Sequence, residues 1–276
     1  MNRCLWLAAG LISAGLFLPA VSNAQGLGDN SLTRTDSIRA GNKMQEAYLS
    51  QTLGDPSEEA AYQAFHKTTE QLDKKIKLGD AFLAKYPGDR YSAAVYEELC
   101  YTYYEKKDLA SFYMFSDKGL ALFPDDVHLL ALNGWVTPRA FTPDEPGADT
   151  KLDNAESQAR HALDVLSKME KPTNLTDEQF AQFKTGEAAV AHSGLGLIHF
   201  RREHYDDSAK ELQIAIAGEA NPDTTDLFIL GADLENMSRY KEAADAFDRC
   251  AQIAGVMQDR CKQYVGEAMK RAAEAK

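Results

Sequence analysis

Two stretches of this chain repeat the same order of small and large residues at a spacing of 35 positions. In each, a leucine and a glycine are followed nine residues later by a tyrosine: Leu195-Gly196 by Tyr205, and Leu230-Gly231 by Tyr240. Small, large and small residues then recur at matching places, namely Ser208, Leu212 and Ala215, and Ala243, Phe247 and Cys250. A small residue on one helix lets the next helix approach closely, and a large residue fills the gap that is left. The spacing therefore predicts stacked pairs of helices.

A third copy of the pattern begins at Leu99-Cys100 and closes at Pro124. Its remaining positions are Leu109, Phe112, Ser116 and Gly119. From residue 57 onward apolar residues recur at steps of three and four, which is typical of one face of a helix. The sequence has no sustained alternation of β-branched residues bounded by turn glycines, so we expect no sheet. The predicted fold class is all-α.

The copies at 93–126, 189–222 and 224–257 resemble the tetratricopeptide repeat (TPR). This resemblance implies an α-solenoid of about four to five antiparallel helix pairs. The copy at 224–257 matches the family pattern best. The copy at 93–126 departs from it in three residues, Cys100, Phe112 and Ser116.

The repeat spacing also predicts the organisation of the domain 57–276. We expect helix pairs near 57–89, 93–126, 127–171, 177–222 and 224–257, followed by an amphipathic capping helix at 256–276. An acidic, proline-containing loop at 137–151 interrupts the third of these pairs. Thr176 and Gln179 have the spacing of a capping box that opens a long helix running through Phe200.

The first 24 residues are typical of a cleavable secretory signal. Arg3 supplies a positive start, Leu5 to Val21 is almost wholly apolar, and Ser22-Asn23-Ala24 offers small residues at a cleavage site. The alternative is an uncleaved anchor, which Pro19 disfavours. We therefore expect an exported protein, periplasmic or secreted, that begins with a polar, loosely ordered or partly helical segment at 25–56.

Three cysteines remain after cleavage of the predicted signal. Cys250 and Cys261 are eleven residues apart with Gly255 between them, so two antiparallel helices could bring their sulfur atoms together in an oxidising compartment. We expect a disulfide at this pair as one of two outcomes, the other being free thiols. Cys100 occupies a position for a small buried residue and is expected to be an inert core thiol.

Charge and hydropathy limit the classes of partner. The formal net charge is −12, which disfavours a broad phosphate-binding surface and hence a nucleic-acid partner. No second apolar run approaches membrane-spanning length, so we expect no stable membrane insertion after signal cleavage. Without a basic cluster, adhesion to anionic lipid is not expected either.

No residue pattern indicates catalysis, a metal or a cofactor. His192 and His199 share a helical face, but the repeat places packing residues at both positions, so structural histidines are the preferred interpretation. His192-Ser193-Gly194-Leu195-Gly196 lacks the strand and the earlier glycine that a nucleophile elbow needs. We expect no enzyme activity and no cofactor.

The TPR resemblance implies that the first helix of each pair lines a concave surface that binds an extended peptide or a partner helix. The candidate binding residues are Glu97, Tyr101, Tyr104 and Glu105 in one copy, Ser193, Leu197, Phe200 and Arg201 in the next, and Phe228, Ala232, Glu235 and Asn236 in the last. Some of these aromatic residues could instead pack against a neighbouring pair. Family members that grip a carboxylate use lysine, arginine and asparagine at positions where this chain has Glu97, Tyr101 and Tyr104, so we do not expect that mode of binding.

The expected function is a non-enzymatic protein-interaction scaffold of the cell envelope with a protein or peptide partner. One alternative is a structural or assembly factor of an outer-membrane or secretion machine. Another is a hydrolase with its site in the interruption at 137–176.

Overall fold

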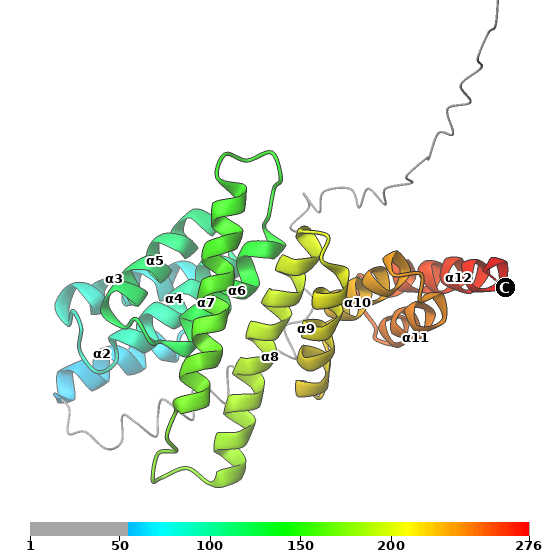
Figure 1. Ribbon diagram of the computed structural model, residues 1–276. Coiled ribbons are helices and arrows are strands. Elements are labelled where there is room, and N and C mark those ends of the chain that lie inside the picture. Colours follow the sequence, from blue (N-terminus) through cyan, green and yellow to red (C-terminus); the bar gives the residue numbers. More distant parts are fainter. Residues whose placement is uncertain (1–54, 276) are drawn as a thin grey trace, which may run out of the picture.

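The computed structural model describes residues 55–275, and over this range it contains eleven helices and no strand (Figure 1). The helices are α2 (Pro56–His66), α3 (Leu72–Lys85), α4 (Ser92–Glu105), α5 (Leu109–Leu122), α6 (Val127–Arg139), α7 (Ala148–Lys168), α8 (Asp177–Arg201), α9 (Tyr205–Gly218), α10 (Thr224–Asn236), α11 (Tyr240–Ala251) and α12 (Gln258–Glu274). The predicted signal peptide and nearly all of the segment 25–56 lie outside the described residues.

The helices form successive pairs, from α2–α3 at one end to α10–α11 at the other, and α12 follows the last pair (Figure 1). Successive first helices contact one another (α2 with α4, α4 with α6, α6 with α8, and α8 with α10), and the second helix of each pair also contacts the first helix of the next. The predicted all-α solenoid of antiparallel helix pairs is therefore confirmed. Among the described residues, no helix has both the length and the apolar character that a membrane span requires.

Small residues bring the helices together. A Cβ atom added to Gly231 would lie 2.5 Å from the ring of Phe247, and one added to Gly196 would lie 2.6 Å from Leu212. Between pairs, a Cβ on Gly194 of α8 would lie 2.5 Å from the carbonyl oxygen of Gly134 on α6. The first two contacts are within the repeated blocks, and the third joins two successive first helices by direct backbone approach.

The interruption of the third pair is shorter than the loop expected at 137–151. Helix α6 continues through Pro138 to Arg139, and α7 already begins at Ala148. Proline is tolerated in the last turn because the following amides still find carbonyl partners, as the Ala140 N–H does at Val136 O (3.0 Å). The capping box at the start of α8 is formed by Thr176 and Gln179 as predicted.

Helix α12 is fixed to α11 by a disulfide between Cys250 and Cys261, whose Cα atoms are 5.8 Å apart and whose side chains are fully buried. Cys100 is a free, buried cysteine, and burial raises the pKa of its thiol. Next to the disulfide, Phe228, Phe247 and Tyr264 form an aromatic cluster with ring centroids 5.0–5.4 Å apart. The end of the solenoid therefore has a covalent clamp and a packed core of its own.

We expect the double variant Cys250→Ala/Cys261→Ala to unfold about 2–4 kcal/mol more easily than the native chain, because an open loop has more conformational freedom when unfolded. Denaturant unfolding followed by far-ultraviolet circular dichroism measures the change. Equal unfolding midpoints for the two proteins would show that the disulfide does not stabilise α12.

The glycine contact between α6 and α8 predicts a second stability difference. Gly194→Ala places a methyl group against the backbone of Gly134, so we expect a loss of about 1–3 kcal/mol in the free energy of unfolding. Gly266→Ala is the matched control, because this exposed helical glycine of α12 has nothing within 4 Å of the added Cβ. The control should gain about 0.5–1 kcal/mol from helix propensity. A Gly194→Ala variant as stable as the control would contradict the close approach.

Candidate functional site

Side chains from alternate helices meet along one side of the solenoid, where the first helices of successive pairs contact one another. We call this surface the first-helix face. It comprises Glu97, Tyr101 and Tyr104 of α4; Asp126, His128, Trp135 and Arg139 at the start of and along α6; Glu187, Ser193 and Arg201 of α8; and Glu219, Asp223 and Asp226 at and before the start of α10.

Aromatic contacts join α4 to α6 on this face. The ring of Tyr104 meets Trp135 edge-on at 5.7 Å, and Tyr101 meets His128 in the same manner at 5.8 Å. Tyr101 and Tyr104 are half-buried, whereas Trp135 is 9% exposed. The guanidinium of Arg139 lies over the Trp135 ring, 3.7 Å from its centroid. Such a run of aromatic rings offers a large apolar area with polar edges.

Arg139 connects three first helices. Its Nη1 donates to the carbonyl oxygen of Trp135 (3.1 Å), and its Nη2 donates to Ser193 Oγ (2.9 Å), Asp226 Oδ1 (2.9 Å) and Asp223 Oδ2 (3.3 Å). Only 5% of Arg139 is exposed. A buried guanidinium with charged hydrogen bonds on several helices aligns those helices strongly.

Carboxyl groups outnumber cations around Arg139. Glu219, which is half-buried, accepts from the backbone N–H of Asp223 at 3.2 Å. Burial, and after it the charges of Asp226 and Asp223, raises the pKa of Glu219 to about 8. Burial also raises the pKa of Asp226 to about 7, against the opposing effect of Arg139. At neutral pH, Glu219 is therefore mostly protonated.

A second charged group lies where α4, α6 and α8 meet. His128 Nδ1 is 2.9 Å from Glu187 Oε1, and both residues are buried. Burial lowers the pKa of His128, but the charges of Glu187, Tyr101 and Glu97 outweigh it and hold this pKa well above its usual value. Burial, and then the charge of Asp126, raises the pKa of Glu97 well above its usual value, and the two carboxyl groups share a hydrogen bond.

The structure places some of the predicted binding residues on the first-helix face. Glu97, Tyr101 and Tyr104 lie there, and Ser193 contacts Arg139. Arg201 is half-buried, and its Nε donates to the carbonyl oxygen of Pro138 at 3.2 Å.

The other candidates near the ends of α4 and α8 lie apart from these contacts or at their edge. Glu105 is exposed at the end of α4, and Phe200 is half-buried against Tyr205 with centroids 6.1 Å apart.

The α10 candidates and Leu197 are placed differently from the prediction. Leu197, Phe228, Ala232 and Glu235 are all buried, with between 2% and 6% of each residue exposed. The ring of Phe228 packs on Phe247 and Tyr264 because α12 continues the stack beside α10. Expecting Phe228 and Leu197 to be exposed partner contacts was therefore wrong. Of the α10 candidates only Asn236 is exposed.

The residues of α6 were not among the sequence candidates, although they lie at the centre of the face. The repeat signal was available: a step of 34 residues from Cys100 reaches Gly134, where an added Cβ would lie 2.7 Å from Ala159 of α7, the second helix of the same pair, as at the other repeat glycines. In that register Trp135 and Arg139 occupy places equivalent to the α4 candidates Tyr101 and Glu105. Because the proline before Arg139 indicated a loop, the sequence did not predict that Arg139 belongs to the helix.

The sequence candidates His192 and Ser193 each bond to a different residue of the chain. His192 Nδ1 lies 2.6 Å from Glu211 Oε2, and Ser193 is paired with Arg139 instead of with an imidazole. Within residues 55–275, no group of three His, Cys, Asp or Glu side chains has the arrangement of a metal site. Near the interruption of the third pair, Lys151 and Glu145 form an exposed ion pair (2.5 Å).

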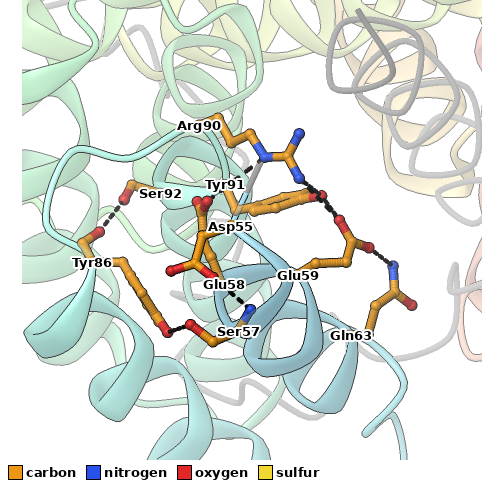
Figure 2. Close-up of polar contacts among 9 residues, drawn as sticks. All are labelled: Asp55, Ser57, Glu58, Glu59, Gln63, Tyr86, Arg90, Tyr91 and Ser92. Atoms are coloured by element: carbon orange, nitrogen blue, oxygen red, sulfur yellow. Dashed lines mark hydrogen bonds and ion pairs between the residues drawn. The ribbon is translucent and has the colours of Figure 1, made fainter. Parts of the chain in front are cut away.

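A polar cluster also joins α2 to the turn between α3 and α4 (Figure 2). Arg90 Nη2 donates to Tyr91 Oη (2.7 Å) and to Glu59 (3.0 Å), and Tyr91 donates to the same carboxylate. Burial, and then the hydrogen bond with Glu59, raises the pKa of Tyr91 to about 12. Because these bonds join Glu59 of α2 to Arg90 and Tyr91, the cluster fastens α2 to the next pair.

No protein-family model matches the chain, and the search of curated proteins finds no significant relative. The proposals below therefore rest on the residues and their geometry.

We expect the pH dependence of stability to change in Glu219→Gln. In the unfolded chain this carboxyl ionises near pH 4.5, whereas in the folded protein its pKa is about 8. Rising pH between these values therefore lowers the free energy of unfolding, by at most about 1.4 kcal/mol per pH unit for this one group. Glutamine keeps the acceptor for Asp223 and removes the charge.

Denaturant unfolding at several pH values between about pH 5 and pH 8 tests this expectation. The native chain should lose stability with rising pH more steeply than Glu219→Gln. Asp245→Asn, which removes one exposed charge on α11, should keep the native slope. Parallel curves for the native chain and Glu219→Gln would contradict the assigned shift.

Proposed function

We propose that this chain is a TPR-like binding platform, without enzyme activity, that holds a peptide or a partner helix on the first-helix face. The observation that carries the proposal is the pair of half-buried tyrosines on α4, Tyr101 and Tyr104, whose rings are supported from behind by His128 and the buried Trp135 of α6. Tyrosine, tryptophan and arginine are the residue types enriched at the energetic centres of protein interfaces.

The stacking of first helices supports this choice of surface. Because α4, α6, α8 and α10 follow one another in contact, their side chains form one surface that spans four helix pairs. An extended peptide rises about 3.3 Å per residue, so a segment of several residues can contact side chains from more than one pair. Rigid scaffolds lose little conformational entropy on binding, which favours affinity.

Export to an oxidising compartment is part of the proposal. The N-terminal pattern of a secretory signal and the Cys250–Cys261 disulfide support it independently of each other. Buried disulfides are rare in reducing compartments and common in exported proteins. The partner is therefore expected in the cell envelope or outside the cell.

Site-specific photocrosslinking tests the location of the partner. A photoreactive phenylalanine analogue at Tyr101 or Tyr104 should yield the same crosslinked partner in an envelope extract. The control is the same analogue at Met114, which is 45% exposed on α5, outside the first-helix face. Adducts at Met114 with none at Tyr101 or Tyr104 would move the binding surface to the second helices.

A further inference from the structure

The first-helix face carries more carboxyl groups than cations. Its acidic members are Glu97, Asp126, Glu187, Glu219, Asp223 and Asp226, and its basic members are Arg139, Arg201 and the histidine His128. Ion pairs with two basic residues neutralise some of these carboxylates. Arg139 pairs with Asp223 and Asp226, and His128 pairs with Glu187.

Three of these carboxyl groups form no ion pair with another described residue: Glu97, Asp126 and Glu219. Glu97 and Asp126 bond to each other, and Glu219 accepts from a backbone amide. One cation, Arg201, likewise forms no ion pair within residues 55–275, and it bonds to a carbonyl oxygen. On this face, carboxyl groups without an ion-pair partner therefore outnumber such cations by three to one, although Glu219 is mostly protonated at neutral pH and Glu97 and Asp126 share a hydrogen bond.

The half-buried members show where a ligand could reach these carboxyl groups. Glu97 and Glu219 are each half-buried, so part of each residue is exposed to solvent. Tyr101 and Tyr104 are half-buried beside Glu97 and present aromatic rings. A positive side chain gains from both environments: it pairs with a carboxylate, and it is attracted to the face of an aromatic ring.

We propose that the segment held on the first-helix face is a basic peptide, whose lysine or arginine side chains approach Glu97 and Glu219 and whose apolar parts lie on Tyr101 and Tyr104. This inference rests on the proposed function and specifies its partner. The net charge of −12 adds long-range attraction for such a peptide.

Proton release should accompany binding. Glu219 faces Asp223 at the N-cap of α10, Asp226 of α10 and Arg139 of α6, and Arg201 of α8 lies beside Arg139. With its pKa at about 8, Glu219 is mostly protonated at pH 7 in the free protein. A lysine or arginine placed beside it favours the carboxylate, so binding expels a proton and affinity rises with pH toward about pH 8.

Selection from a random peptide library displayed on phage tests the charge of the ligand directly. The full exported chain is the bait, and the net charge of the enriched peptides is the readout. We expect enriched peptides to carry net positive charge and to lose binding to Tyr104→Ala. Enrichment of neutral or acidic peptides that also depend on Tyr104 would overturn the inference but leave the proposed function standing.

Calorimetry with the best basic peptide then tests the proposed contact. We expect Glu219→Gln to weaken binding about threefold to tenfold and to reduce proton release, measured in buffers of different ionisation enthalpy. Asp245→Asn removes the same charge from the outer side of α11 and should change affinity less than twofold. Equal losses in both variants would show non-specific attraction to an acidic protein and would overturn the inference. If no peptide is enriched by the native chain, both the inference and the proposed function fail.

Discussion

The close backbone approach of α6 and α8 at Gly134 and Gly194 is the contact on which the rest of the structure depends. A single added methyl group at Gly194 would lie 2.5 Å from the opposite carbonyl oxygen, so a side chain there would force the two helices apart. Because α6 and α8 are this near, Arg139 can reach Ser193 on α8 and Asp226 on α10 at 2.9 Å each. The spacing of the helices and the charge network on the first-helix face thus have one origin.

Burial of charged groups on the first-helix face lowers the free energy of unfolding of the protein. Carboxyl groups removed from water favour their protonated form, and the raised pKa values of Glu219 and Asp226 express that preference. An apolar surface would be more stable in isolation. Retaining the charges is consistent with the proposed recognition of a basic peptide and with the alignment of the helices by Arg139.

The repeat pattern was sufficient to predict the fold because it depends on local volume. Gly196 with Leu212, and Gly231 with Phe247, pack in the structure as the alternation of small and large residues implied. The binding surface was harder to predict, because it depends on which helix comes next. Phe228 has the position of a surface residue within its own repeat, yet α12 covers it, and a repeat pattern says little about the helix after the last copy.

Trp135 and Arg139 were not predicted, because at this place the sequence pattern is irregular although the helix is regular. The interruption after α6 disturbs the sequence pattern but not the helix, which keeps its register through Pro138. The 34-residue step that leads from Cys100 to Gly134 also places both residues at repeat positions equivalent to candidates on α4.

Hydroxyl-radical footprinting of the protein with and without its partner tests the central claim most directly, because tyrosine, tryptophan and methionine side chains all report in one experiment. If a partner occupies the first-helix face, oxidation of Tyr101 and Tyr104 falls on binding, while that of Met114 and Met269, which are 45% and 57% exposed, stays the same. Protection of Met114 or Met269 with no change at the two tyrosines would contradict it.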